Sequence, residues 1–243
     1  MFNILAVFGI EHIIYLILMI ILMVLGLIFI KKSNLDEYKL NLIFRIIGII
    51  WLITILANRI TVTYSDVVIN KREGYTWLNL IPNTFCGMCS LILSITFIIG
   101  KKDNFVLHSF GYIGLVGGIV TMFYPDFLDS QAFFDPRSIT GLLHHTIMAF
   151  MIILAILTGY MTPTVKKWHY IPLGMCVIMT IGMFELDCLG FVKAMQFKNP
   201  FLSSIPILSS WYVTDLATLV VSFILLTIYD MKKKNCSFKE VFK

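Results

Sequence analysis

The stretch Leu78–Gly100, which reads LNLIPNTFCGMCSLILSITFIIG, indicates the fold class of this chain. It contains no Asp, Glu, Lys or Arg, and a helix of about 20 apolar residues crosses the roughly 30 Å hydrocarbon core of a membrane. Two further charge-free stretches follow it, Asn104–Pro125 and Ser138–Val165. Three such stretches in one chain indicate a polytopic membrane protein.

The composition of the whole chain agrees with this interpretation. Only 14% of the 243 residues are charged, against about 25% in a typical soluble protein, and the mean hydropathy is +0.88. A transmembrane barrel would need alternating apolar and polar residues instead of long apolar runs. We therefore expect an all-α bundle, with residues 1–243 forming a single transmembrane helical domain.

Apolar stretches between clusters of charge predict about seven spans. The first residues lack a basic segment and an A-x-A-like cleavage site, so we expect the first span to remain in the mature protein. The predicted spans are Ile4–Ile30, Leu40–Asn58, Leu78–Gly100, Asn104–Tyr124, Ile139–Met161, Trp168–Leu189 and Trp211–Tyr229.

The distribution of basic residues predicts the orientation, because cytoplasmic loops are enriched in Lys and Arg. One set of loops and the carboxyl-terminal tail carry twelve basic residues, and the opposite set carries six. We therefore expect the amino terminus outside and the carboxyl terminus inside. The net charge of +5 is then mainly a topology signal, and no nucleic-acid partner is needed to explain it.

Ionisable residues inside membrane spans are costly and are candidates for function. On the predicted topology most of them lie near the outer side, whereas His108 and Arg45 fall toward the inner face, where an interfacial role suffices. This distribution indicates an active or binding site near the outer leaflet, and the alternative is a set of structural hydrogen bonds between helices. The outer residues are His12, Arg59, Cys86, His144, Glu185, Asp187 and Asp215.

Cys86 and the adjacent His144 and His145 offer the most distinct chemistry of this group. A thiol becomes a nucleophilic thiolate when a nearby base takes its proton, and histidine is the usual base. Neighbouring helical residues point about 100° apart, so only one of the two histidines should face Cys86. The alternative is that Cys86 is a small apolar filler and the histidines are structural.

Four short segments occur in an order that resembles a known family. They are Phe8–His12 (FGIEH), Ile81–Cys86 (IPNTFC), Tyr124–Asp126 (YPD) and Leu142–His145 (LLHH). Together they resemble the YwaF family of bacterial integral membrane proteins, which is related to the vertebrate transmembrane acyltransferase that remodels ether phospholipids. The resemblance covers roughly residues 8–160.

The resemblance implies a lipid acyltransferase of the bacterial plasma membrane that forms a thioester on Cys86, with His144 as its base. Asn83 and the first amides of the third span are candidate donors to the oxyanion, and His12 or Glu185 could orient the base. Arg59 and Asp215 complete the set of substrate-binding or supporting residues. Membrane lipids are the expected partners, and neither a cofactor nor a metal is expected.

Other functions remain open at this stage. Cys86 and Cys89 form a C-x-x-C pair, which is typical of a thiol-disulfide oxidoreductase. The outer charges suit a small-molecule or ion transporter, and Cys86, Cys89, His144 and His145 could hold a metal. The apolar segment 193–210 would serve as a lid, a re-entrant plug or an interfacial connection. Gly111, Gly114, Gly117 and Gly118 favour close packing within the bundle over contacts in a homo-oligomer.

The orientation can be tested with single cysteines introduced into the loop 59–77 and into the tail after Asp230. On intact cells an impermeant maleimide should label the loop and spare the tail, because the twelve basic residues keep the tail inside. Labelling of the tail from outside would contradict the orientation and the outer-leaflet location of the site.

Overall fold

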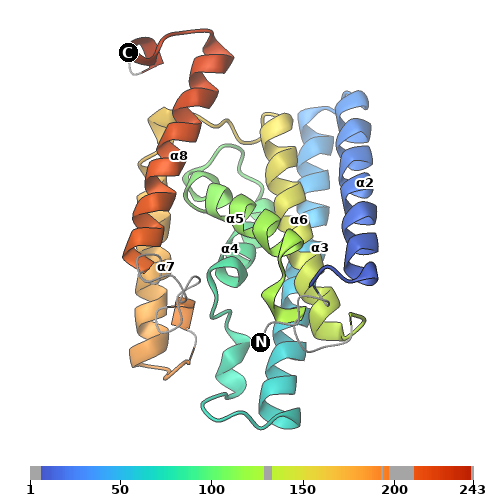
Figure 1. Cartoon of the computed structure of the whole chain (residues 1–243). Coiled ribbons are helices and arrows are strands. Elements are labelled where there is room, and N and C mark those ends of the chain that lie inside the picture. Colours follow the sequence, from blue (N-terminus) through green and yellow to red (C-terminus); the bar gives the residue numbers. More distant parts are fainter. Residues whose placement is uncertain (1–6, 129–132, 193, 197–210, 242–243) are drawn as a thin grey trace.

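A computed structural model describes residues 7–128, 133–192, 194–196 and 211–241. The described part of the chain is helical and has no strand, which confirms the all-α prediction. One long helix corresponds to each predicted span (Figure 1). These helices are α2 (Ile10–Lys32), α3 (Glu37–Tyr64), α4 (Phe85–Ile99), α5 (Phe105–Phe123), α6 (Pro136–Leu157), α7 (Tyr170–Asp187) and α8 (Trp211–Lys234).

Short polar side chains begin the helices, as helix capping requires. The Asp36 carboxylate accepts from the Lys39 amide at 2.8 Å, and Asn104 accepts from the Leu107 amide at 3.0 Å. At the other end of α4, Gly100 adopts a left-handed conformation with φ of 74°, which glycine tolerates without steric cost. Local sequence therefore determines where these helices start and stop.

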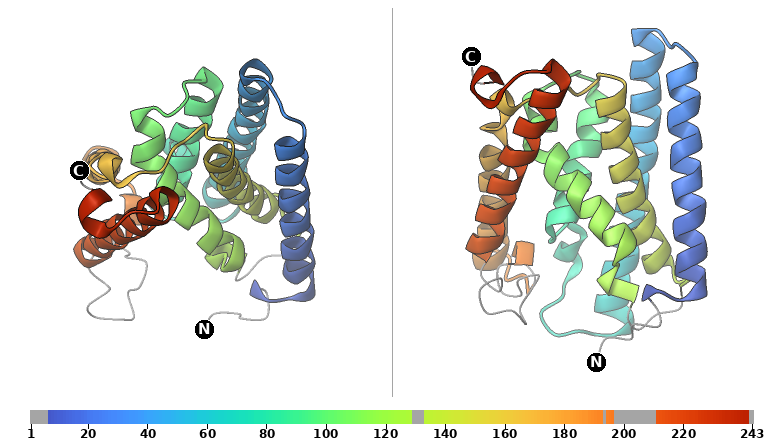
Figure 2. Two further views of the ribbon diagram at one scale, coloured as in Figure 1. Left: turned by 90° about the horizontal axis from the view of Figure 1, so that it is seen from above. Right: turned by 45° about the horizontal axis from the view of Figure 1, so that its top comes forward.

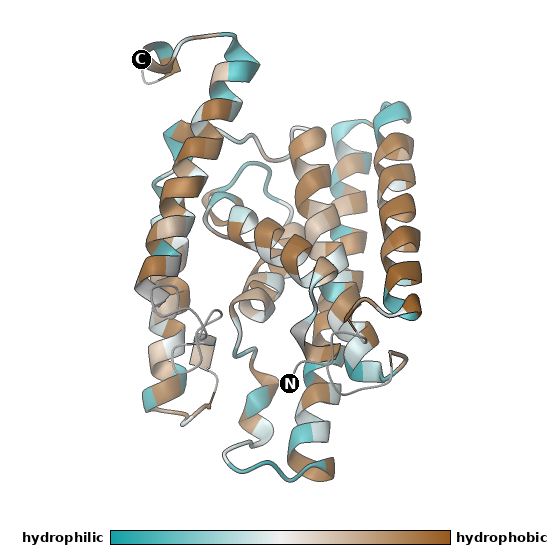
Figure 3. Cartoon of the chain, in the orientation of Figure 1, coloured by the Kyte–Doolittle hydropathy of each residue, from teal (hydrophilic) through white to brown (hydrophobic). Residues whose placement is uncertain are grey.

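Within the described residues, five helical segments are long and apolar enough to cross a membrane, and the chain is a multi-pass membrane protein. These segments are Ile10–Lys32, Glu37–Ile69, Phe105–Phe123, Pro136–Leu157 and Val165–Asp187. In the most apolar part of α2 only 17% of residues are buried inside the protein, against 61% in α6. Thus α6 lies in the interior of the bundle and α2 presents an apolar surface to lipid at its edge (Figure 3).

Helices α3, α4, α5 and α6 pack around the main core, and α7 and α8 lie beside one another at one side (Figure 2). In that core the Phe44 ring lies 4.1 Å from the Tyr160 ring and 5.2 Å from the Phe97 ring, measured between centroids. Trp168 joins α8 through its Nε1, which donates to the Leu219 carbonyl at 3.1 Å.

Two spans differ from their predicted bounds in ways that matter for function. α3 continues to Tyr64 and then as a π-helix over Ser65–Ile69, so Arg59 lies within a helix and not just beyond the end of the span predicted at Asn58. The predicted third span is divided, with a short 3₁₀ helix at Trp77–Leu80 and α4 starting only at Phe85. Pro82 explains the division, because the residue before a proline disfavours helical geometry, and Ile81 is extended (ψ 129°).

The loops predicted to share the inner side do lie together at one end of the bundle. Asp103 precedes α5 and accepts at 2.8 Å from the Thr162 amide of the α6–α7 loop, and its other carboxylate oxygen contacts Lys167. From α8, Asp230 accepts from the Thr164 hydroxyl at 2.7 Å. These contacts join two connecting loops and the end of α8, which are far apart in the sequence.

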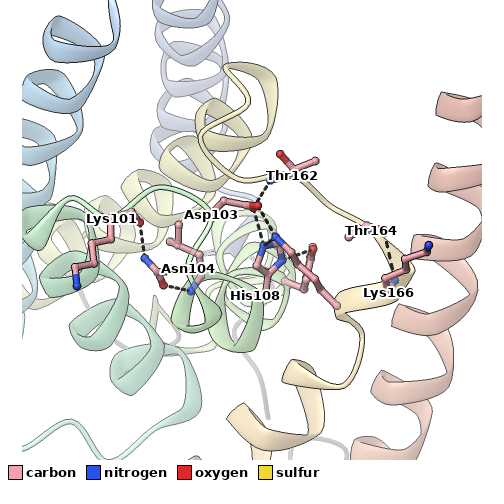
Figure 4. A network of polar contacts seen from close by, with 10 residues as sticks. Lys101, Asp103, Asn104, His108, Thr162, Thr164 and Lys166 are labelled. Atoms are coloured by element: carbon pink, nitrogen blue, oxygen red, sulfur yellow. Dashed lines mark hydrogen bonds and ion pairs between the residues drawn. The ribbon is translucent and has the colours of Figure 1, made fainter.

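His108 belongs to this network of loop contacts and is fully buried within it (Figure 4). Its Nε2 donates to Asp103 at 2.8 Å, and the Tyr112 hydroxyl lies 3.1 Å from its Nδ1. Burial raises the pKa of Asp103, but hydrogen bonds from Lys167, the Thr162 amide and His108 outweigh it, so the pKa lies below its usual value. The charged carboxylate is therefore the form that the fold stabilises.

We expect Asp103→Ala to lower the free energy of unfolding by about 2 kcal/mol, the scale of lost charged hydrogen bonds. In wild type this contribution is present above the ordinary carboxyl pKa of about 3.9. It is lost as pH falls through the lower folded pKa. Thermal unfolding in detergent between pH 3 and 7 measures both effects. Lys166→Ala, an exposed neighbour, is the control, and equal stability of the two variants would contradict the prediction.

Candidate functional site

The amino terminus of α4 lies inside the bundle, and the candidate site is built around it. Asn83, in the segment that leads to the helix, is 3% exposed, and the Met195 amide donates to its carbonyl at 3.0 Å. Thr84 caps the helix by accepting from the Gly87 amide at 3.2 Å. A helix amino terminus carries a partial positive charge and N–H groups without intrahelical acceptors. The site therefore favours an anion.

Cys86 lies in the first turn of α4 and is partly exposed. In the predicted span Leu78–Gly100, Cys86 would lie two turns into a helix. In the structure Cys86 is the second residue of α4 and follows an extended segment. Its thiol packs against Gly117 of α5, where a β-carbon would come within 2.7 Å of the Cys86 Sγ. Only glycine at position 117 leaves room for the thiol in this place.

His144 comes from α6 and faces α4. Its Nδ1 lies 3.1 Å from the hydroxyl of Ser90, and Ser90 follows Cys86 by four residues. Positions four apart lie on the same face of a helix, so the α4 face that carries Cys86 is the face that meets His144. The structure thus places His144 against α4 one turn beyond Cys86, while the Cys86 thiol packs against Gly117 of α5.

His145 occupies a different position. Its ring stacks on Phe127 with a centroid distance of 6.5 Å, and its Nδ1 is buried without a hydrogen-bond partner among the described residues. The two histidine rings nevertheless lie 4.0 Å apart. The contact with Ser90 therefore distinguishes His144 from its neighbour, a choice that the sequence left open.

Arg59 and Glu185 place opposite charges near this site. The Arg59 Nη2 donates to the carbonyls of Asn79 and Ile81, in the segment that precedes α4. Glu185 of α7 is 1% exposed, and neither carboxylate oxygen has a hydrogen-bond partner among the described residues. Arg59 lies within electrostatic range of Asp66 and Glu185, and also of His144. Buried polar groups normally have partners, so these groups are suited to meet a ligand.

Two predicted supporting residues have no described contact with the α4 site. His12 is fully buried, and its ring nitrogens contact the carbonyls of Val7 and, at 3.1 Å, Met122. It fastens α2 to the end of α5 and has no described contact with His144, so the proposed orienting role falls to other groups. Asp215 lies in α8, and no described contact links it to the α4 site; its Oδ2 is buried without a partner.

The segment after α7 reaches the site at one described point. Ala194 and Met195 are buried, and Met195 contacts the main chain of Asn83. The rest of the predicted lid, residue 193 and residues 197–210, lies outside the described residues.

The alternative sites receive different support. Cys89 is fully buried in the main core, one turn beyond Cys86. No three His, Cys, Asp or Glu side chains converge as a metal site within the described ranges, so the considered Cys86, Cys89, His144 and His145 set is not assembled. The four glycines of α5 all face neighbours within the bundle, as the packing interpretation predicted.

Ser90 is the residue of the candidate site that sequence reasoning missed. A serine in an apolar helix is common and gives no signal alone. Its spacing of four residues from Cys86 would have placed it on the same helix face, but the sequence does not indicate which helix faces it.

Comparison with known proteins adds the family relationship. A family model described as the TMEM164 family matches residues 7–229, which include every candidate residue named above. The comparisons with curated proteins and with solved structures returned no match.

Adjacent glycines on α5 allow a matched test of this geometry. Gly117→Ala should displace the Cys86 thiol, whereas Gly118→Ala would bring a β-carbon within 2.9 Å of the His145 carbonyl and force α5 away from α6. We expect Gly117→Ala to change the rate of Cys86 alkylation by iodoacetamide severalfold with little loss of thermal stability. Gly118→Ala should chiefly lower the unfolding temperature. Alkylation unchanged in Gly117→Ala would contradict the described contact.

Proposed function

Because the chain belongs to the TMEM164 family, we propose that it is a membrane-embedded lipid acyltransferase with Cys86 as nucleophile and His144 as base. The observation that carries the proposal is the common face of α4. It presents Cys86 in the first turn of a buried helix and, one turn later, Ser90 in contact with His144. A thiol at a helix amino terminus beside an imidazole is a typical activated nucleophile.

In the first half-reaction His144 takes the Cys86 proton, and the sulfur attacks the ester carbonyl carbon of a phospholipid. The ester C–O bond breaks, the acyl group remains on sulfur as a thioester, and the departing lysophospholipid oxygen receives the proton from His144. Negative charge on the carbonyl oxygen is stabilised by the first amides of α4 and by Asn83. The positive end of the helix dipole acts in the same direction.

In the second half-reaction a hydroxyl of an acceptor lipid attacks the thioester. His144 takes the hydroxyl proton, the new ester forms, and the C–S bond breaks to return the Cys86 thiolate, which regains the proton from His144. No cofactor is consumed, because one ester is exchanged for another. The reaction therefore needs only membrane lipids as partners.

Arg59 and Glu185 are suited to hold the polar part of the lipid. Arg59 has a buried Nε without a described partner, and Glu185 offers two unpartnered oxygens. A zwitterionic or hydroxyl-bearing headgroup would supply both an acceptor for the guanidinium and a donor for the carboxylate. In this proposal Asp215 makes a further contact with the headgroup, and the segment 193–210 covers the site.

The proposed location is the outer leaflet of a bacterial plasma membrane, in keeping with the resemblance to the YwaF proteins. The amino terminus is proposed to lie outside, because the basic residues are concentrated in the opposite set of loops. Outer-leaflet lipids would reach Cys86 through the division between the 3₁₀ helix and α4. A thiol-disulfide oxidoreductase is the competing function, since Cys86 and Cys89 lie one turn apart on α4.

The nucleophile can be tested in proteoliposomes that contain a phospholipid with a labelled acyl chain and a lysophospholipid acceptor. Cys86→Ala should abolish acyl transfer and the hydroxylamine-sensitive acyl group on the protein, whereas Cys89→Ala should retain most of both. His144→Ala should lower the rate by about 10² to 10⁴, the usual size of a general-base contribution. His145→Ala should have a smaller effect, because, of the two histidines, it is His144 that contacts Ser90.

The outcomes separate the competing functions. Acyl transfer by Cys86→Ala at the wild-type rate would exclude the thiol as nucleophile. Equal losses in the two cysteine variants, with a reversible disulfide in wild type, would favour the oxidoreductase. Far-UV circular dichroism and thermal unfolding of each variant exclude loss of fold as the cause.

A further inference from the structure

We propose that Ser90 and Met148 fix the tautomer of His144, placing its proton on Nδ1 and leaving a lone pair on Nε2. The Ser90 hydroxyl has two neighbours, the Nδ1 of His144 at 3.1 Å and the Sδ of Met148 at 3.3 Å. All three side chains are nearly or fully buried, with exposed fractions of 0%, 4% and 0% for Ser90, His144 and Met148. The inference rests on the proposed function only for the catalytic use of that lone pair.

Donors and acceptors can be counted around the hydroxyl. A serine hydroxyl carries one proton, and a thioether sulfur can only accept. When the Ser90 proton is donated to Met148, the Ser90 oxygen can only accept from His144. The Nδ1 of His144 must then carry a proton. This arrangement makes two hydrogen bonds, whereas donation from Ser90 to Nδ1 makes one and leaves the sulfur without a donor.

The position of the sulfur is held by packing. Gly114 of α5 lies against Met148, and a β-carbon there would come within 3.2 Å of its Sδ and 2.8 Å of Leu93. The thioether therefore lies in a space between α5 and α6 that the glycine leaves open. Ser90 of α4 lies between His144 and Met148, which are both on α6. The two partners of the hydroxyl are therefore held by one rigid helix.

The tautomer determines which nitrogen of His144 can act as a base. A neutral imidazole has one protonated and one unprotonated nitrogen, and only the unprotonated nitrogen accepts the thiol proton. With Nδ1 protonated and bonded to Ser90, the Nε2 is the accepting atom. Ser90 is thus a positioning residue, since it acts on Cys86 only through His144.

Solid-state NMR of protein with ¹⁵N-labelled histidine rings, reconstituted in phospholipid vesicles at pH 7.5, tests the tautomer. The signals absent from His144→Asn identify His144, and they should report a protonated Nδ1. Met148→Leu removes the sulfur acceptor at similar volume, so the hydroxyl can turn to Nδ1 and the signals should shift toward a protonated Nε2. Met151→Leu, a fully buried methionine on the same helix, should leave them unchanged.

A protonated Nε2 in wild type, or signals that do not differ between Met148→Leu and wild type, would overturn the inference. Acyl transfer gives the second measurement. Met148→Leu and Ser90→Ala should lower kcat severalfold with little change in KM. Ser94→Ala, whose hydroxyl bonds within its own helix to the Leu91 carbonyl at 2.9 Å, should not lower kcat.

Failure of the inference and failure of the proposed function remain distinguishable. If Cys86→Ala retains acyl transfer, the proposed nucleophile is wrong while the NMR result still decides the tautomer. If Cys86→Ala is inactive but Met148→Leu matches wild type in both kcat and NMR signals, Cys86 remains the proposed nucleophile. The inference that Ser90 and Met148 fix the His144 tautomer is then wrong.

Discussion

The interruption of a membrane-spanning helix at Pro82 is the constraint on which the rest of the structure depends. Backbone groups at membrane depth need protein partners, because the hydrocarbon offers none. The segment before α4 meets this need through the Arg59 side chain, which donates to two of its carbonyls, and through Met195, whose amide donates to Asn83. Arg59 and the segment after α7 are therefore structural requirements of the interruption as well as parts of the candidate site.

The same interruption places a polar helix end in the interior. Without it, a continuous helix over Leu78–Gly100 would have no free amides near Cys86 and would carry its dipole at the surface. With it, the amino terminus of α4 meets α5 and α6, and the positive end of the helix lies beside a thiol. A shorter helix thus provides an electrostatic environment that a complete span could not provide.

Glycine on α5 is what allows the two neighbouring helices to approach this point. Gly117 accommodates the Cys86 thiol, Gly118 the backbone of α6, and Gly114 the side chains of Leu93 and Met148. Close backbone approach brings Ser90 within hydrogen-bond range of His144. At the opposite end, Asp103 pairs with Lys167 and accepts a hydrogen bond from His108, and these contacts join the connecting loops. The polar groups of the bundle therefore gather in a candidate site at one end and attach loops at the other.

The sequence was sufficient to predict the membrane class, the helical fold and the approximate order of the spans, because apolar length and charge placement act locally along the chain. It also indicated Cys86 and the His144–His145 pair, since those residue types are costly in a membrane. It did not reveal the true start of α4, although Pro82 was visible, because an apolar run containing a proline can remain helical when neighbours satisfy its backbone. Three further features depend on which helix faces meet. They are the contact of Ser90 with His144 rather than His145, the contact of His12 with the end of α5, and the position of Ser90 itself. Helix rotation and contact are set by packing between distant segments, such as Gly117 against Cys86, and no local pattern encodes them.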